Sequence, residues 1–277
     1  MFNGKNKKKT FLAAMTMLLV SAIVITSASF AWFSLGKSAA VNNIDIKVKS
    51  TEGILISTEE NGTYGAEIQG ADLKGLENNY FSNLFDPASS NFSGTTPVFY
   101  RGGIADGKIK TTAVTEEENC GLYAFDVYIK YVNNDASATT TVKVGGSSIT
   151  VSDPDEGDTD AAGNAVVKNE AVAKAFRVGF IAGSQSCMFA NDATANDTNP
   201  ITKADTFDVT SGVATGVTGS YACNVAIAGE TSSTAQLTLN AGVNKVRVYV
   251  WMEGQDANCV DEMASQKLSI NLVFEQI

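Results

Sequence analysis

Five carboxylates lie within eight residues near the middle of the chain. They are Asp153, Asp155, Glu156, Asp158 and Asp160, and Gly163 and Asn164 follow them. Calcium takes about six to eight oxygen ligands, which acidic loops bearing glycine can supply. The spacing is not that of an EF-hand, because Gly157 stands at the fifth position and Asn164 at the twelfth. The stretch predicts either a calcium loop, with its four aspartates as ligands, or a solvated acidic loop.

A second candidate site lies near the C-terminus, where Trp251 stands close to Glu253 and Asp256. An aromatic ring beside two carboxylates suits a sugar-binding cleft, and a retaining glycosidase needs its two carboxyl groups ~5 Å apart. In the alternative interpretation Trp251 packs in the core and residues 253–256 form a turn. We favour this structural interpretation over the catalytic one.

The chain contains no histidine. Without histidine, neither Ser-His-Asp nor Cys-His nucleophilic machinery can be assembled. The H-E-x-x-H metalloprotease motif and histidine-ligated zinc are excluded for the same reason. Because only carboxylate-pair chemistry remains, we predict a protein that is not an enzyme, with no catalytic residue and no cofactor other than the calcium considered above.

An uncharged apolar run, Phe11–Leu35, follows four lysines at positions 5, 7, 8 and 9. A basic start, an apolar segment and then small residues form the pattern of a secretory signal. Ser29 and Ala31 fit cleavage after Ala31, and a second candidate cleavage site follows Ala40. The alternative is an uncleaved membrane anchor, because ~20 apolar residues span a bilayer. Residues 1–31 are therefore a predicted signal peptide or anchor, and the rest of the chain is predicted to be exported.

The chain is acidic, with 20 Lys and Arg against 30 Asp and Glu and a net charge of −10. A field of this sign repels nucleic acid and anionic membrane surfaces. We therefore predict no nucleic-acid partner, and contact with a membrane only through the N-terminal segment. The acidity also suits solubility outside the cell.

The four cysteines of the chain are Cys120, Cys187, Cys223 and Cys259. An even number in an exported chain predicts two disulfides, and four cysteines permit three pairings. No C-x-x-C occurs, so the usual redox motif and zinc knuckle are not expected. The alternative is four separate buried thiols.

Alternation of apolar with polar residues predicts short strands throughout residues 32–277. The clearest is Leu122–Val132, in which every second residue from Tyr123 to Tyr131 is apolar or aromatic. Residues 142–144 and 148–151 are predicted to form a hairpin across Gly145 and Gly146. Further strands are predicted at 43–49, 176–181, 223–227, 236–239, 246–253 and 268–274.

Strands of this number and length predict an all-β fold, a single antiparallel β-sandwich domain of jelly-roll type. Residues 165–175 are rich in alanine with Lys and Glu interspersed, and they form the one predicted helix. Two irregular stretches, about 66–93 and 183–221, are predicted to be loop insertions. The first is expected to contain one helical turn and to tuck its aromatic side chains against the sandwich.

Two stretches resemble exported proteins of Gram-positive bacteria. Residues Ala28–Ser34, followed after a short spacer by Asn42–Ile46, resemble the N-terminal region of the TasA and camelysin family of surface and biofilm-matrix proteins, which have jelly-roll folds. Residues Val248–Asp256 with Cys259 are similar to the closing strands of uncharacterised exported proteins of clostridia. The resemblance implies a structural subunit that polymerises outside the cell. The peptidase activity ascribed to camelysin is not carried over, because the chain lacks histidine.

The amphipathic strand at 43–49 is the candidate for assembly, and its apolar side chains are Ile44, Ile46 and Val48. A strand close to a free terminus can leave its own sheet and add to the edge of a neighbour's sheet. Head-to-tail addition of this kind produces filaments, because it does not close on itself. The alternative is that the strand simply completes its own sandwich.

Taken together, these features predict an exported structural protein of the Gram-positive cell surface or extracellular matrix. Its predicted partners are other copies of the chain, with which it forms filaments, or other surface proteins. The alternative function is a carbohydrate-binding module of adhesin type or a carboxylate-dependent glycosidase. An open groove lined by Trp251 with paired carboxylates would favour that alternative.

Overall fold

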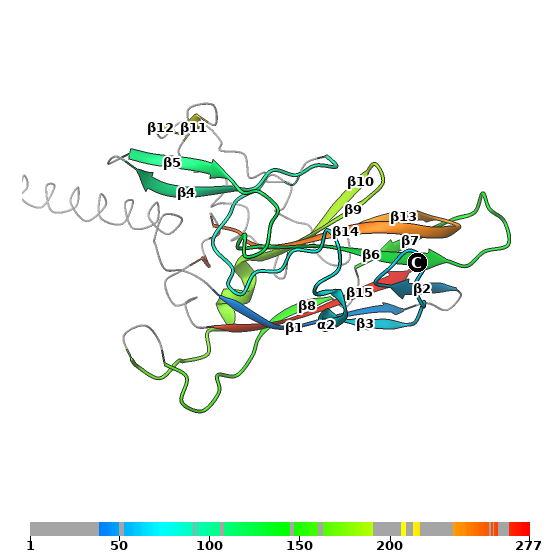
Figure 1. Cartoon of the computed structure of the whole chain (residues 1–277), viewed down its shortest axis with the longest axis horizontal. Coiled ribbons are helices and arrows are strands. Elements are labelled where there is room, and N and C mark those ends of the chain that lie inside the picture. Colours follow the sequence, from blue (N-terminus) through cyan, green and yellow to red (C-terminus); the bar gives the residue numbers. More distant parts are fainter. Residues whose placement is uncertain are drawn as a thin grey trace, which may run out of the picture.

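The computed structural model describes residues 39–49, 53–90, 92, 94–105, 108–144, 147–159, 163–190, 206–208, 213–216, 235–254, 256, 258–259 and 266–277. The predicted signal peptide or anchor, residues 1–31, lies outside these ranges. Most of the regular structure described is β-strand, which confirms the prediction of an all-β fold (Figure 1). A search of the same ranges finds no helix whose length and apolarity suffice to span a membrane.

The first sheet contains both the first and the last strand described, and we call it the terminal sheet (Figure 1). Its strand order is β13-β7-β15-β1-β3, and β8 also pairs with β15. Buried and exposed side chains alternate along these strands, so one face of the sheet is apolar and the other polar. The strands are β1 (Ala40–Lys49), β3 (Glu67–Gln69), β7 (Thr139–Lys143), β8 (Ser148–Val151), β13 (Gln236–Asn240) and β15 (Lys267–Gln276).

The second sheet, which we call the central sheet, has the order β10-β9-β14-β6-β2 and is antiparallel throughout. Its strands are β2 (Ile54–Ser57), β6 (Tyr123–Tyr131), β9 (Phe176–Ala182), β10 (Gln185–Ala190) and β14 (Gly242–Met252). The strand predicted at Leu122–Val132 is confirmed as β6. It pairs with β14 along nine residues, from Tyr123 to Tyr131.

A third, smaller sheet has the order β11-β12-β5-β4. Its strands are β4 (Tyr100–Ala105), β5 (Lys108–Ala113), β11 (Thr206–Asp208) and β12 (Val213–Gly216). β4 and β5 form a hairpin in which Ala105 pairs with Lys108.

The terminal and central sheets face each other across one hydrophobic core. Ile44 and Ile46 of β1, Phe274 of β15 and Phe180 of β9 belong to the same cluster of buried side chains. The rings of Phe180 and Phe274 meet edge to face, with centroids 5.5 Å apart and an angle of 77° between their planes. Because a fully buried side chain of this size stabilises the fold by ~1.5–3 kcal/mol, this core holds the two layers together.

The outer face of the central sheet is also covered. Trp251 and Tyr249 of β14 pack in a second cluster with Phe92 and Phe99 from the connection that precedes β4. The rings of Phe92 and Trp251 stack with centroids 5.3 Å apart. Gly179 of β9 lies under this stack, and a Cβ there would stand 2.1 Å from Phe92 Cζ. The sequence therefore needs glycine at this point of a buried strand.

One pairing contradicts the prediction of a purely antiparallel sandwich. β1 and β15 run parallel, with Ile44 beside Ile270 and Ile46 beside Leu272. A parallel pair needs a long crossover connection, and here almost the whole described chain lies between the two strands. The terminal sheet is therefore mixed: β1 runs parallel to β15, whereas the other pairs in the sheet are antiparallel.

The predicted hairpin between residues 142–144 and 148–151 is also wrong. Both strands pair with β15: residues 148–151 pair with 268–271, and Val142 and Lys143 pair with Gln276 and Glu275. β15 has ten residues, which is enough to take β8 and β7 one after the other on the same edge. Gly145 and Gly146, across which the hairpin was expected, lie outside the described residues.

The helix predicted at 165–175 is shorter in the structure and is a 3₁₀ helix, η2 (Glu170–Ala175). The side chain of Asn169 caps it by accepting a hydrogen bond from the backbone N–H of Ala171, at 3.1 Å. Asparagine favours this capping position over a helix interior, so the helix begins after Asn169. Ala165 instead pairs with Thr159 in an isolated bridge.

The two predicted insertions have different outcomes. Residues 66–93 contain β3 and the expected single helical turn, α2 (Gly70–Leu73), and Phe81, Phe85 and Phe92 are buried as predicted. The insertion at 183–221 was placed too early, because Gln185–Ala190 form β10 and pair with β9. The turn at 183–184 joins these two strands as a hairpin.

Candidate functional site

The candidate assembly strand is β1, and its apolar side chains point into the core as the sequence predicted. Ile44 and Ile46 are buried, and Val48 is half-buried against the same cluster. In the parallel register, Ile44, Ile46 and Val48 stand beside Ile270, Leu272 and Phe274 of β15. In this structure β1 therefore completes its own sandwich.

The opposite edge of β1 has a much shorter partner. β3 pairs with only three of its residues, from Asp45 to Lys47. The ion pair between Lys47 and Glu67 is long, at 3.6 Å, and both side chains are largely exposed, so it contributes only ~0–1 kcal/mol. Just before β1, Ala39 exchanges two backbone hydrogen bonds with Phe85, at 3.2 and 2.7 Å. β15 is therefore the principal partner of β1.

The acidic loop is held by a lysine from the last strand. Lys267 Nζ of β15 lies 2.5 Å from Asp155 Oδ2 and 2.7 Å from Asp158 Oδ2. Hydrogen bonds from Lys267 and from the backbone N–H of Asp155 hold the pKa of Asp158 below its usual value. The hydrogen bonds to Asp155 and Asp158 raise the pKa of Lys267. Two of the four predicted calcium ligands thus share one ammonium group.

The other aspartates of the loop do not join them. Asp153 pairs with Lys168 at 3.1 Å, and Lys168 also contacts Glu170 at 2.8 Å. Asp160 lies outside the described residues. Within the described ranges, no group of three or more acidic or cysteine side chains is gathered as metal ligands would be. The described part of the loop is a set of carboxylate–ammonium pairs on the surface.

We expect the melting temperature of the protein to be equal in millimolar calcium and in excess chelator. Lys267 and Lys168 already lie against the loop carboxylates, so a cation would have to displace them. Thermal unfolding followed by circular dichroism measures this, because a ligand that binds only the folded state raises its melting temperature. A rise with calcium that Asp158→Asn abolishes would instead support the calcium loop.

Trp251 does not line a groove, because its side chain is fully buried. Its Nε1–H donates to Glu253 Oε2 at 3.1 Å, and Ser89 Oγ–H donates to Glu253 Oε1 at 2.5 Å. Glu253 is itself fully buried. The carboxylate therefore serves as a buried acceptor that joins β14 to the connection before β4. The structural interpretation of Trp251 is confirmed.

Asp256 also has a structural partner. Its side chain forms a fully buried ion pair with Arg177 of β9. Asp256 Oδ1 accepts from the backbone N–H and the side-chain Nδ2 of Asn258, at 2.7 and 2.9 Å. The backbone N–H of Asp256 donates to Glu253 O at 3.1 Å, which is the turn predicted for residues 253–256. Neither carboxylate is open to a substrate from the surface.

Three of the four cysteines lie in the part of the chain that the structure describes, and they are not joined to one another. Cys120, Cys187 and Cys259 are buried, and no disulfide joins any two of them. Cys223 lies outside the described residues. A disulfide to Cys223 stays a prediction.

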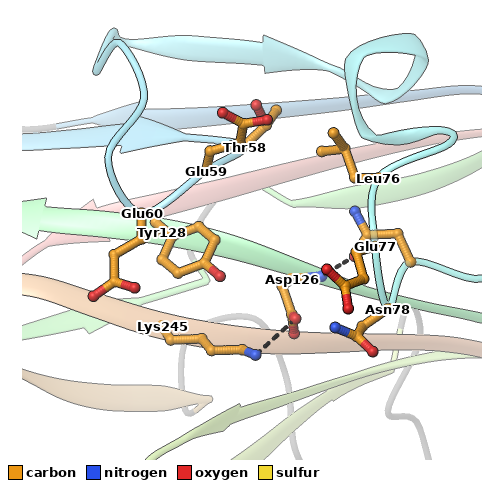
Figure 2. Close-up of a pocket in the computed structure, with 10 residues that line it drawn as sticks. Thr58, Glu59, Glu60, Leu76, Glu77, Asn78, Asp126, Tyr128 and Lys245 are labelled. Carbon is orange, nitrogen blue, oxygen red and sulfur yellow. Dashed lines mark hydrogen bonds and ion pairs between the residues drawn. The ribbon is translucent and has the colours of Figure 1, made fainter.

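An open hollow of about 210 Å³ lies beside β6 and β14, between two connections of the chain (Figure 2). Lys245 Nζ contacts Asp126 Oδ2 at 2.8 Å on its floor. Carboxylates around a tyrosine can accept hydrogen bonds from hydroxyl or ammonium groups of a ligand. The lining residues are Thr58, Glu59, Glu60, Leu76, Glu77, Asn78, Asn79, Asp126, Tyr128 and Lys245.

A network of charged side chains borders this hollow and holds Asp126, one of its lining residues, in place. Arg247 donates to Asp126 Oδ1 at 3.3 Å and to Glu116 Oε2 at 2.5 Å. Tyr249 donates its hydroxyl to Glu116 Oε1 at 2.8 Å. Burial, with a smaller effect of the Glu116 carboxylate, raises the pKa of Tyr249 to about 12. The network therefore ties the stretch around Glu116 to β14, with the phenol neutral at physiological pH.

The residues of this hollow were not singled out from the sequence, although a signal was present. In β6 the predicted apolar face consists of the odd-numbered residues, so Asp126 and Tyr128 belong to the opposite face. Asp126 stands opposite Arg247, and Tyr128 opposite Lys245, in the register with β14. Pairing these two strands would have placed the charges together, but the sequence does not specify which strands pair.

Comparison with known proteins adds no relative to this description. No protein-family model, curated protein or solved structure matches the chain. The geometry described above gives two candidate sites, β1 with its partner strands and the hollow at Asp126 and Tyr128.

Proposed function

We propose that the chain is an exported structural protein of the Gram-positive cell surface or extracellular matrix, whose copies join by donation of β1. The signal-like start of the chain supports export, and the lack of histidine supports a non-enzymatic role. The single observation that carries the assembly mode is the place of β1. It is the first strand described, yet it lies inside the terminal sheet, against the last strand.

The contacts of β1 can be made equally well by a second copy. Only four residues connect Lys49 in one sheet with Ile54 in the other, and short connections of this kind favour exchange of an element between copies. A departing β1 frees the edge of β15 and the apolar space beside Ile270, Leu272 and Phe274. A neighbour's β1 restores the same hydrogen bonds and fills the same space, so exchange costs little free energy at equilibrium.

The proposal includes a jelly-roll path for the two facing sheets and a likeness of architecture to the TasA and camelysin family. Pairing between strands far apart in sequence, such as β1 with β15 and β7 with β13, supports the first part. The N-terminal motif at residues 28–46 supports the second. On this view the partners are other copies of the chain, and neither a cofactor nor nucleic acid is required.

Electron microscopy tests strand donation directly. We expect the chain from residue 32 onward to form filaments, and a version lacking residues 32–49 to form none. An excess of a synthetic peptide with the sequence of residues 40–49 should shorten the filaments, because it occupies the β15 edge without offering an edge in return. A peptide with aspartate in place of Ile44 and Ile46 is the matched control and should have no effect.

Two outcomes would count against the proposal. Equal filaments from both versions would remove strand donation as the mode of assembly. If neither version forms filaments, a monomeric surface protein or one held by its N-terminal anchor becomes the better description.

A further inference from the structure

β13 forms one edge of the terminal sheet as described, because it pairs with β7 on one side only. Its alternate residues face β7: Ala235 O accepts from Val144 N at 3.1 Å, and Ala241 N donates to Ala138 O at 2.8 Å. Residues 236, 238 and 240 consequently direct their backbone N–H and C=O groups away from the sheet. Such outward groups form a template on which another strand can pair.

β13 lacks the common protection of an edge strand. Its sequence is Gln-Leu-Thr-Leu-Asn, with no charged residue and no proline. Natural edge strands are often protected by lysine, other charges, proline or a bulge, which oppose pairing with a second chain. β13 pairs with β7 in continuous register over five residues. A different feature must keep this edge from pairing.

The side chain of Gln185 occupies the outward groups of Thr238. Gln185 Nε2 donates to Thr238 O at 2.9 Å, and Thr238 N donates to Gln185 Oε1 at 2.9 Å. The carboxamide thus makes the two hydrogen bonds that one residue of an added strand would make. Gln185 is the first residue of β10 in the central sheet, so this contact also links the edges of the two sheets.

Asn244 does the same at Asn240. Asn240 N donates to Asn244 Oδ1 at 2.9 Å, and Asn244 Nδ2 donates to Asn240 O at 2.8 Å. Asn244 Nδ2 also lies 3.1 Å from Gly242 O, which fixes the corner where the chain passes from β13 into β14. Two of the three outward-facing residues of β13 are therefore already paired with side-chain amides.

We propose that the edge of β13 can pair with β13 of a second copy. The side chains of Gln185 and Asn244 prevent this pairing because they occupy the outward backbone groups of β13. Antiparallel pairing about Thr238 would bring residue 236 of one copy opposite residue 240 of the other. The pairing is two-fold symmetric, so it closes as a dimer rather than growing into a filament. With uncharged residues on both strands, no like-charge repulsion opposes it. The two carboxamides are the groups that prevent it.

The test uses the full chain, kept soluble in a mild detergent, with Thr238→Cys as a reporter of β13–β13 contact. Under mild oxidation, we expect the Gln185→Ala, Asn244→Ala variant to form about tenfold more reducible dimer than the reporter chain alone. A tenfold change corresponds to roughly the net effect of one or two ordinary hydrogen bonds. Mass spectrometry should place the new disulfide at position 238. The position of this disulfide distinguishes the β13 contact from filaments joined through β1, whose contact strands are β1 and β15.

Gln236→Ala is the matched control, because it alters an exposed side chain of the same strand and removes neither carboxamide. It should leave the dimer fraction at that of the reporter chain. Gln185→Met keeps the length of the side chain and removes only its hydrogen bonds, and by itself it should raise the dimer fraction in a fully folded protein. If this variant melts like the reporter chain and forms no additional dimer, the proposed closure of β13 is wrong.

Discussion

Replacing Asp256 with alanine is expected to lower the free energy of unfolding by about 3–5 kcal/mol, because it leaves the charge of Arg177 buried without its partner. Both side chains are fully excluded from solvent. The two Nη1 contacts of Arg177, to Lys174 O at 2.5 Å and Phe176 O at 3.1 Å, give the guanidinium neutral acceptors but do not neutralise its charge. Urea unfolding at neutral pH, followed by circular dichroism, measures the loss.

Glu67→Ala is the control for this experiment, because it breaks an exposed ion pair of the terminal sheet. Its expected cost is ~0–1 kcal/mol. Replacing both buried partners, with Arg177→Met and Asp256→Leu together, should recover part of the loss, since apolar residues of similar volume often substitute for a buried pair. A cost below about 1 kcal/mol for Asp256→Ala would show that Arg177 finds solvent or another anion in the folded protein.

The periodicity of the sequence predicted individual strands well. In β6 the alternation of apolar and polar residues identified the strand and the residues of its core face, and Phe125, Val127 and Ile129 are all fully buried. In β1 the same pattern identified Ile44 and Ile46 as core residues. Both predictions succeeded for the same reason. When one face of a strand is buried, apolar and polar residues alternate along its sequence.

The partners of each strand could not be predicted in the same way. Nothing in the local pattern of β1 specifies a parallel neighbour more than two hundred residues away. β14 illustrates a further difficulty, because Tyr249 and Trp251 on its nominally outer face are buried by a separate connection. The alternation predicted a strand there, and packing of Trp251 was favoured, but it did not show that residues 248–252 are all buried.

The candidate site residues show the same limit. Their spacing can be read from a short stretch of sequence, whereas the side chains that pair with them come from distant parts of the chain. The spacing of Asp153, Asp155 and Asp158 was compatible with calcium, but it did not reveal that Lys267, over a hundred residues later, lies between two of them. Trp251 and Glu253 were likewise compatible with a cleft, although packing was favoured, and their spacing did not reveal that Phe92 and Ser89 lie against them. Side chains of functional types thus form a site only when no other part of the chain pairs with them or buries them.

Replacing Trp251 with alanine is expected to destabilise the protein by about 3–5 kcal/mol, which is typical of removing a large buried aromatic side chain. Trp251 stacks on Phe92 and meets Phe99 edge to face, with centroids 5.3 and 5.2 Å apart. Its removal leaves a cavity in the outer cluster of the central sheet. It also removes one donor from the buried carboxylate of Glu253. Urea unfolding of the variant measures the combined effect.

Trp251→Phe separates the two contributions, because it keeps an aromatic ring in the cluster and removes the indole N–H. We expect it to cost about 1–3 kcal/mol, the usual penalty for leaving a buried polar group without a partner. Val167→Ala is the control, because Val167 is 79% exposed and surface substitutions usually change stability by ~0.5 kcal/mol or less. A glycan panel with the same variants gives the decisive contrast. If Trp251→Ala kept full stability and abolished binding to a glycan, Trp251 would belong to an open sugar site rather than to the core.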